Sequence, residues 1–279
     1  MTAAASQLFI AQPSISLAIS EMEDYYGVKL FDRISRKLYL TENGRRALQY
    51  ARHIIDLLDE MEQGVRDVDA MGRLKVGTSI TIGTYLLPGY IKKLKQQYPA
   101  LKVEASIANS GTIEQQILDN DIDVGIIEGV AHSPFILSES FAGDRLVFIC
   151  PAGHEFAGKT LEELSEVRNQ DFILREKGSA GREIFDGILA AQELNVRPIW
   201  QSASNQVILQ GVKAGLGISI LPYFLVRQDI REGELAEFRI KDLALNRKYS
   251  VIYHKNKFLP RSARTLMELC KEGNGADRP

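Results

Sequence analysis

The sequence predicts an α/β protein preceded by a small α-helical domain. Short apolar stretches of strand type alternate with helical stretches over residues 72–279, a pattern typical of parallel sheets with crossover helices. Residues 1–71 instead combine two short helices, a basic hairpin and one long helix with heptad spacing. The 279 residues suffice for two domains of about 100–200 residues each.

Composition and charge exclude several classes of protein. The net charge of −2 argues against a protein that coats nucleic acid or membrane by charge alone. Cys150 and Cys270 stand far apart and form neither a disulfide framework nor a metal-ligand motif. The N-terminus has no signal-peptide pattern, and no apolar run approaches the ~20 residues of a membrane span. We therefore expect a cytoplasmic protein with no membrane contact, no metal and no cofactor.

The stretch "QPSISLAISEMEDYYG" predicts a helix that starts at a proline. Pro13 fits the first turn of a helix, where its missing N–H is no loss, and Gly27 fits the position just after the last turn. Three apolar residues recur at four- and three-residue spacing and predict one buried stripe: Ile15, Ile19 and Met22. The preceding "TAAASQLFIA" predicts another short helix.

Residues 28–44 predict a small hairpin with basic residues at its tip. Polar and apolar residues alternate on both sides of the tip sequence "ISRK". Two short helices followed by a basic hairpin form a winged helix-turn-helix pattern. We place this domain at residues 1–44.

Residues 45–71 predict a long linker helix that Thr41 caps, with Glu42 in its first turn. Apolar residues fall on heptad spacing, with Glu62 in the one missing place: Leu48, Ala51, Ile55, Leu58 and Val65. This seam predicts a dimerising coiled coil. The alternative is a single amphipathic helix that lies on its own domain.

Residues 72–279 predict two βα units in series that meet near Asp144. In the first unit, "RLKVGTS", "LKVEASIA" and "DVGIIEG" are predicted strands separated by helical stretches. The alternation repeats after Asp144, and the helical stretch "RSARTLMELCKEG" closes the chain.

Several of these stretches resemble one protein family. "AAASQLFIAQPSISLAISEMEDYYGVKLFDRISRKLYLTENG" closely resembles the DNA-binding domain of LysR-type transcriptional regulators, and "GTSITIGTYLLP", "DVGIIEG" and "VKAGLGISILP" resemble their effector-binding domain. The resemblance implies a two-lobed, periplasmic-binding-protein-like effector domain over residues 72–279. We place subdomain I at residues 72–144 and 255–279, and subdomain II at residues 145–254.

The sequence departs from the family at its start. Family members carry a further helix before the "AAA" helix, and it supplies much of the small core. We therefore expect that this helix has been lost, through an internal start codon or by shortening. A natural variant without the helix is the alternative.

The resemblance also implies which residues meet DNA. In a helix-turn-helix, the second helix enters the major groove with its N-terminal residues, here Gln12, Pro13, Ser14 and Ser16. The wing contributes basic residues for phosphate contacts: Arg33, Arg36 and Lys37. Leu17, Ala18 and Ser20 stand where many members have Arg or Lys, which predicts modest affinity per domain. The alternative for Ser14 and Ser16 is that they only satisfy N–H groups at the helix start.

Three segments after predicted strands carry polar residues at helix starts, where ligands of open parallel sheets bind. The candidate effector-binding residues are Ser79, Thr81, Ser179, Arg182, Ser204 and Asn205. Helix N-termini with hydroxyl groups suit an anion, so we expect a small carboxylate or an inorganic oxyanion rather than a flat aromatic molecule. Glu128 is a further candidate. Its carboxylate would either disfavour an anionic ligand or form a hydrogen bond with a ligand whose acidic group is protonated. Ordinary helix capping is the alternative for each serine or threonine.

Two other classes compete with this interpretation. An enzyme is disfavoured because the four histidines stand in no catalytic or metal motif, and because Gly215 and Gly217 follow a helix rather than a strand. A solute-binding protein without productive DNA binding shares the two-lobed fold but carries no helix-turn-helix.

The sequence therefore favours a ligand-responsive, DNA-binding transcriptional regulator over an enzyme. The expected partners are double-stranded operator DNA, a small anionic effector and further copies of the chain in a homodimer or homotetramer. Closure of the interlobe cleft by ligand would change the packing of the effector domains and so the spacing of the DNA-binding domains.

Overall fold

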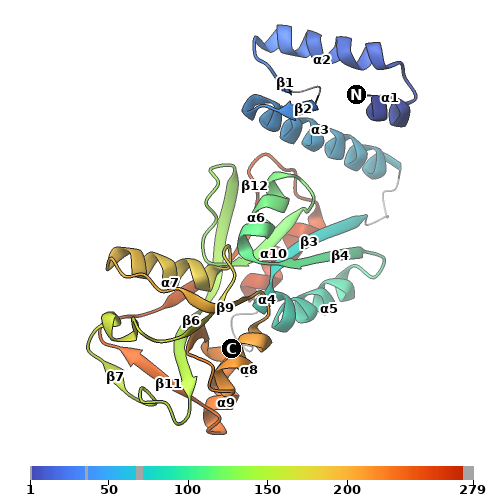
Figure 1. Ribbon diagram of the computed structural model, residues 1–279. Helices are drawn as coiled ribbons and strands as arrows, with labels where there is room; N and C mark the ends of the chain where they lie inside the picture. The colour runs from blue at the N-terminus through green and yellow to red at the C-terminus, as the bar shows by residue number, and fades with distance from the viewer. Residues whose placement is uncertain (1, 35–36, 67–71, 273–279) are drawn as a thin grey trace. The chain divides into compact units, whose positions relative to one another are not determined.

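The computed structural model describes residues 2–34, 37–66 and 72–272 and divides the chain into two compact units (Figure 1). The units are Met1–Val68 and Asp69–Pro279. None of the described helices is long and apolar enough to cross a membrane.

The first unit is a short helix pair, a hairpin and a long helix, as predicted. Its elements are α1 (Thr2–Leu8), α2 (Gln12–Tyr26), β1 (Phe31–Ile34), β2 (Lys37–Leu40) and α3 (Glu42–Arg66). Pro13 lies in the first turn of α2, and Gly27 ends the helix in the left-handed conformation at φ 66°. Gly44 allows α3 to start against the hairpin, because a Cβ at this position would lie 2.0 Å from the main-chain oxygen of Leu30.

The first unit buries little apolar surface. Among its described residues, the buried apolar side chains are Ala5 and Leu30. The predicted stripe on α2 is only partly buried: Ile15 and Ile19 are half-buried, whereas Met22 is 42% exposed. The prediction of a buried stripe is therefore wrong at Met22, because this part of α2 has no apolar neighbour among the described residues that covers it. The buried side chain of α2 is instead Glu23.

The seam of α3 is exposed within the chain. Leu48 is 38%, Ile55 58% and Leu58 50% exposed, and Ala51 is exposed as well. The side chain of Val65 lies outside the described residues. The apolar side of α3 is therefore open to a partner. The alternative, a helix that lies on its own domain, would require these apolar side chains to be covered.

The second unit is built on a sheet in the order β4-β3-β5-β12-β6-β11-β7, with β10 also paired to β6. Its strands are β3 (Arg73–Ser79), β4 (Lys102–Ala108), β5 (Val124–Glu128), β6 (Ile136–Pro151), β7 (Thr160–Leu161), β10 (Ser219–Pro222), β11 (Leu235–Ile240) and β12 (Asn246–His254), while β8 (Phe172–Arg175) and β9 (Pro198–Ser202) form a separate parallel pair. The helical elements are α4 (Ile80–Tyr85), α5 (Leu87–Gln97), α6 (Ser110–Leu118), η1 (Leu164–Val167), α7 (Ala180–Ala191), α8 (Asn205–Lys213), α9 (Tyr223–Arg231) and α10 (Arg261–Glu272). The alternation of strands and helices predicted from the sequence is confirmed.

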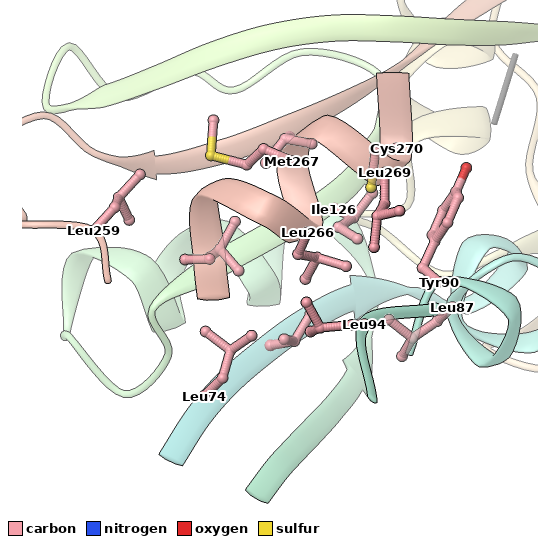
Figure 2. Packing of buried hydrophobic residues seen from close by; sticks show 14 of the residues in the cluster. Leu74, Leu87, Tyr90, Leu94, Ile126, Leu259, Leu266, Met267, Leu269 and Cys270 are labelled. Atoms are coloured by element: carbon pink, nitrogen blue, oxygen red, sulfur yellow. The ribbon is translucent and has the colours of Figure 1, made fainter. Parts of the chain in front are cut away.

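Each of two subdomains has its own core. In the first, β3, β4 and β5 are parallel, and α5 and α10 cover one face of the sheet. Figure 2 shows Leu74, Leu94 and Leu266 converging between β3, α5 and α10. In the second, phenylalanines from strands and from α7 pack together: Phe148, Phe172, Phe185 and Phe238.

Strands β6 and β12 connect the two subdomains. The first half of β6 pairs with β12, and its second half pairs with β10 and β11. Tyr249 and Val251 of β12 lie in the core of the first subdomain, and Ile252 packs with α6 on the other face. The sequence analysis assigned residues up to 254, and so all of β12, to the second subdomain. In the structure β12 pairs with β5 and packs in the first subdomain.

Truncation of Leu94 tests this core. Leu94 is fully buried on α5, so Leu94→Ala removes apolar contacts and leaves a cavity that costs about 2–5 kcal/mol. Urea unfolding followed by far-UV circular dichroism should show this loss. The control Val130→Ala changes a 62% exposed side chain and should stay within about 0.5 kcal/mol of the wild type. Equal stability of the two variants would contradict the described packing.

Candidate functional site

The N-terminus of α2 presents the predicted DNA-contacting residues together. Gln12, Pro13 and Ser14 are exposed, and Ser16 is half-buried. The side chain of Gln12 donates a hydrogen bond to Ser16 Oγ at 2.8 Å. Ala11 occupies the cap position of α2, and its side chain makes no capping hydrogen bond.

The wing is described only in part. The backbone of Arg33 lies on β1 and that of Lys37 on β2, which pair in antiparallel register. Arg36 and the side chains of Arg33 and Lys37 lie outside the described residues.

Glu23 ties α2 to the hairpin. Its Oε1 accepts the N–H groups of Leu30 at 2.8 Å and Phe31 at 3.1 Å, and its Oε2 accepts Lys29 Nζ at 2.6 Å. The hydrogen bond from Lys29, followed by that from Leu30, lowers the pKa of Glu23 from 4.5 to about 2. The sequence analysis did not predict a role for Glu23. Its place next to the apolar side of the helix could have indicated a buried carboxylate with hydrogen-bond partners.

Thr41 joins the hairpin to α3. Its hydroxyl donates to the carbonyl oxygen of Lys29 at 2.6 Å and accepts the Gly44 N–H at 2.9 Å. The predicted cap is thus confirmed. Polar side chains hold the three elements together where the apolar core is small.

The second unit contains a cavity of about 460 Å³ between its subdomains. The first subdomain contributes residues of α4, and the second contributes the start of α8 together with β10 and α9. The lining residues are Ile80, Thr84, Tyr85, Ala203, Ser204, Asn205, Gln206, Leu209, Leu221 and Leu225. None of these side chains carries a charge.

Two of the predicted effector residues line this cavity. Ser204 caps α8 by accepting the Val207 N–H at 3.4 Å, and Asn205 is the first residue of the helix. The first N–H groups of a helix have no partner within it, so they are available to a ligand. Ser79 and Thr81 flank the lining residue Ile80, are buried themselves, and have hydroxyls without a partner among the described residues.

Glu128 is buried at the end of β5 and belongs to an ionic cluster. Its Oε2 accepts Arg247 Nη1 at 3.0 Å, while the Nε and Nη2 of Arg247 each donate to Asp144 at 2.6 Å. Tyr249 donates its hydroxyl to Asp144 at 2.8 Å, and burial raises the pKa of that phenol. The sequence analysis did not select Arg247 or Asp144, because nothing in the segment "LNRKYSVIYH" predicts which strand lies opposite.

Ser179 and Arg182 do not line the cavity. Ser179 caps α7, as the capping alternative expected, and Arg182 donates to Asp186 at 2.7 Å and to the carbonyl oxygen of Arg175 at 3.2 Å. The sequence analysis missed Arg175 at the end of β8. Its Nη1 donates to Asn205 Oδ1 at 2.8 Å, which fixes the cavity-lining amide.

Direct contacts join the two subdomains. The Gly111 N–H donates to the carbonyl oxygen of Gly178 at 3.0 Å, and His132 Nε2 lies 3.1 Å from Glu183 Oε1. The starts of α6 and α7 therefore meet across the boundary.

Comparisons with known proteins agree with both units. Residues 1–45 match the family described as bacterial regulatory helix-turn-helix protein, lysR family, and residues 69–275 match the LysR substrate binding domain.

The chain belongs to the LysR family of transcriptional regulators. It is therefore a DNA-binding regulator with a ligand-binding effector domain, in a family of regulators rather than enzymes. Among curated relatives, the HTH-type transcriptional regulator YeiE of Escherichia coli K12 is 34% identical over 275 residues, 98% of this chain and 92% of the relative. CysL of Bacillus subtilis is 30% identical over 254 residues, 90% of this chain and 85% of the relative.

Solved LysR-type structures share the fold. The regulatory domain of Synechocystis CcmR, in complex with 2-PG, matches with a TM-score of 0.66 and 24% identity over 74% of this chain and 98% of that chain. A full-length OxyR variant from Pseudomonas aeruginosa matches with a TM-score of 0.66 and 21% identity over 97% of this chain and 89% of that chain. The predicted two-lobed, periplasmic-binding-protein-like fold is confirmed.

Neither cysteine of this LysR-type chain is suited to thiol chemistry. Cys150 and Cys270 are buried and lie in the cores of different subdomains. Burial raises the pKa of Cys150 to about 11 and that of Cys270 to about 12. Both remain protonated at neutral pH, where the reactive form of cysteine is the thiolate.

The Glu23 carboxylate should stabilise the DNA-binding unit over a defined pH range. Because its pKa falls from 4.5 in the unfolded chain to about 2 in the fold, the stabilisation is present above about pH 4.5 and is lost as the pH falls through about 2. In Glu23→Gln this acid dependence should be absent, and the unit should melt earlier at neutral pH. The amide NMR signals of Leu30 and Phe31 report both effects.

Glu21→Gln is the matched control, because Glu21 is exposed on the same helix. It should keep the wild-type melting and pH dependence. If Glu23→Gln behaves like Glu21→Gln, the carboxylate does not hold the hairpin.

Proposed function

We propose that this LysR-type regulator binds a small organic acid in the cavity between its two subdomains. The observation that supports the proposal is the uncharged, largely apolar cavity that ends at the N-terminus of α8. A carboxylate suits the free N–H groups at this helix start. Asn205, held by Arg175, adds an amide beside them.

The lining favours an organic acid over an inorganic oxyanion. Its apolar surface comes from both subdomains: Ile80, Tyr85, Leu209, Leu221 and Leu225. A cavity of about 460 Å³ lies within the range of ordinary small-molecule pockets, which bind mainly through apolar contacts. An inorganic oxyanion would leave these side chains without contacts. The complexes of CcmR with 2-PG and of the QuiR effector-binding domain with shikimate support a small organic ligand.

The same proposal assigns the DNA-contacting residues. Gln12, Pro13, Ser14 and Ser16 read base edges from the start of α2, and Arg33, Arg36 and Lys37 contact phosphates. The exposed Ile55 and Leu58 support a homodimer formed through α3, with a homotetramer as its higher assembly. Because each domain offers few basic contacts, two or more domains act together on double-stranded operator DNA.

Ligand binding and DNA binding are coupled through cavity closure. A ligand that touches α4 and α8 together favours the closed arrangement of the subdomains over any open one. The Gly111–Gly178 and His132–Glu183 contacts join the two subdomains directly and support the closed state. The packing of effector domains, and with it the spacing of DNA-binding domains, then depends on ligand.

A charge placed in the cavity tests the proposal. Leu225→Asp puts a carboxylate among the lining residues and should weaken binding of organic acids at least tenfold, by repulsion and by loss of apolar contact. Titration calorimetry with carboxylic acids of about four to ten carbons measures the effect. Leu216→Asp is the control, since Leu216 is 43% exposed and does not line the cavity. Failure of every acid to bind the wild type, or equal binding by the two variants, would refute the proposal.

A further inference from the structure

A buried arginine holds one of the residues that line the cavity. Arg175 ends β8 and is 9% exposed, while Asn205 is the first residue of α8 and lines the cavity. The Nη1 of Arg175 donates to Asn205 Oδ1 at 2.8 Å. Arg175 does not line the cavity itself, so any effect that it has on a ligand there passes through Asn205.

A carboxylate fixes the guanidinium of Arg175 in this position. Glu176 Oε2 accepts Arg175 Nε at 2.9 Å, and Oε1 accepts Nη2 at 3.1 Å, which makes the pair bidentate. Burial opposes the ionisation of Glu176, but the hydrogen bonds from Arg175 outweigh it and lower the pKa of Glu176. Glu176 is therefore ionised at neutral pH and neutralises Arg175. The two bonds leave Nη1 for Asn205.

The bond from Arg175 decides which end of the Asn205 amide is free. A guanidinium only donates hydrogen bonds, so the amide atom that faces Arg175 is the oxygen. The amide nitrogen has no hydrogen-bond partner within the described part of the chain, and it is not among the buried atoms without a partner. The nitrogen is therefore accessible from outside the protein. Its two N–H groups are available to a ligand, whereas the oxygen is turned toward Arg175.

We propose that Arg175 is a positioning residue that sets Asn205 as a hydrogen-bond donor toward the ligand and so favours a carboxylate over a group with its own donors. The inference rests on the proposed function, because it concerns the same carboxylate at the start of α8. A carboxylate offers only acceptors, whereas a primary amide of the same shape places an N–H group against the N–H groups of Asn205 and of the helix start. The Arg175–Glu176 pair has no net charge, so it orients Asn205 without adding a positive charge beside the cavity.

The ratio of two affinities tests this role. Hexanoate and hexanamide share one carbon skeleton and differ in the group that would meet Asn205. If another carboxylic acid binds more tightly, that acid and its primary amide replace them. Calorimetry on the full chain should show hexanoate binding about tenfold more tightly than hexanamide, because the amide leaves a donor facing a donor. In Asn205→Ala this preference should fall by about threefold or more.

A combination of variants shows whether Arg175 acts through Asn205. Arg175→Met together with Glu176→Gln removes the hydrogen bond and leaves no charge of this pair without its partner. Asn205 can then rotate and offer its oxygen to hexanamide, so the preference for hexanoate should fall by about threefold or more. Adding Asn205→Ala to this double variant should cause no further fall, because the changes remove the same interaction.

Arg145→Met together with Glu237→Gln is the matched control. Arg145 and Glu237 form a bidentate pair at 2.9 and 3.2 Å in the same subdomain, and neither residue lines the cavity. This variant should keep the wild-type preference for hexanoate. A loss of stability alone changes both affinities together and leaves their ratio unchanged.

Asn205→Asp keeps the proposal testable even if the Arg175 double variant fails to fold. An aspartate keeps the bond from Arg175 but turns an acceptor toward the ligand in place of a donor. The preference for hexanoate should therefore fall further than in Asn205→Ala. Equal preferences in these two variants would overturn the proposal.

The other outcomes separate the role of Arg175 from the proposed function. An unchanged preference in Asn205→Ala or in the folded Arg175 double variant would overturn this role and leave the proposed function standing. A further fall in the combined variant would overturn it too, since Arg175 would then act independently of Asn205. If no carboxylic acid binds the wild type, the proposed function is refuted and the inference with it.

Discussion

The effector domain depends on one buried guanidinium. Arg247 lies on β12, opposite Asp144 of β6, and reaches Glu128 at the end of β5. These strands include both connections between the subdomains, β6 and β12, and the strand β5 of the first subdomain. Removing one partner from such a cluster leaves a buried charge uncompensated, which typically costs about 3–5 kcal/mol. The cluster therefore fixes the connecting strands and the orientation of Glu128 at the same time.

This arrangement separates two tasks within the effector domain. The apolar cores of the two subdomains provide stability, and the core of the second also contributes Leu209 and Leu221 to the cavity lining. The proposed ligand contacts lie at the boundary, where helix starts and strand ends supply unpaired N–H groups and hydroxyls. A ligand that bridges the boundary acts on the contacts between subdomains rather than on either core. Such differential contacts are what a ligand needs in order to shift a conformational equilibrium.

The sequence predicted the local structure well and the long-range pairing poorly. Thr41 as a cap of α3 and the end of α2 at Gly27 follow from neighbouring residues, and both are confirmed. Met22 was placed in a buried stripe because periodicity shows which side of a helix is apolar but not whether a neighbour covers it. The same limit applies to β12, whose alternating residues predict a strand without indicating that it lies beside β5.

The candidate site shows the same division. Ser204 and Asn205 were found because a helix start after a strand is visible in the sequence, and they line the cavity. Ser179 had the same local signal, but it caps α7 and does not line the cavity, and capping and ligand binding require the same residue types. Arg175 and Arg247 were missed because their roles depend on Asn205 and Glu128, which lie 30 and 119 residues away in the chain.

The central claim is that occupation of the cavity changes how this LysR-type regulator holds DNA. DNase footprinting of the full chain on its operator, with and without a saturating organic acid shown to bind the cavity, tests it most directly. The account predicts that the acid shortens, lengthens or shifts the protected region, because the spacing of the DNA-binding domains changes. An identical footprint and an identical affinity for DNA in both states would contradict it.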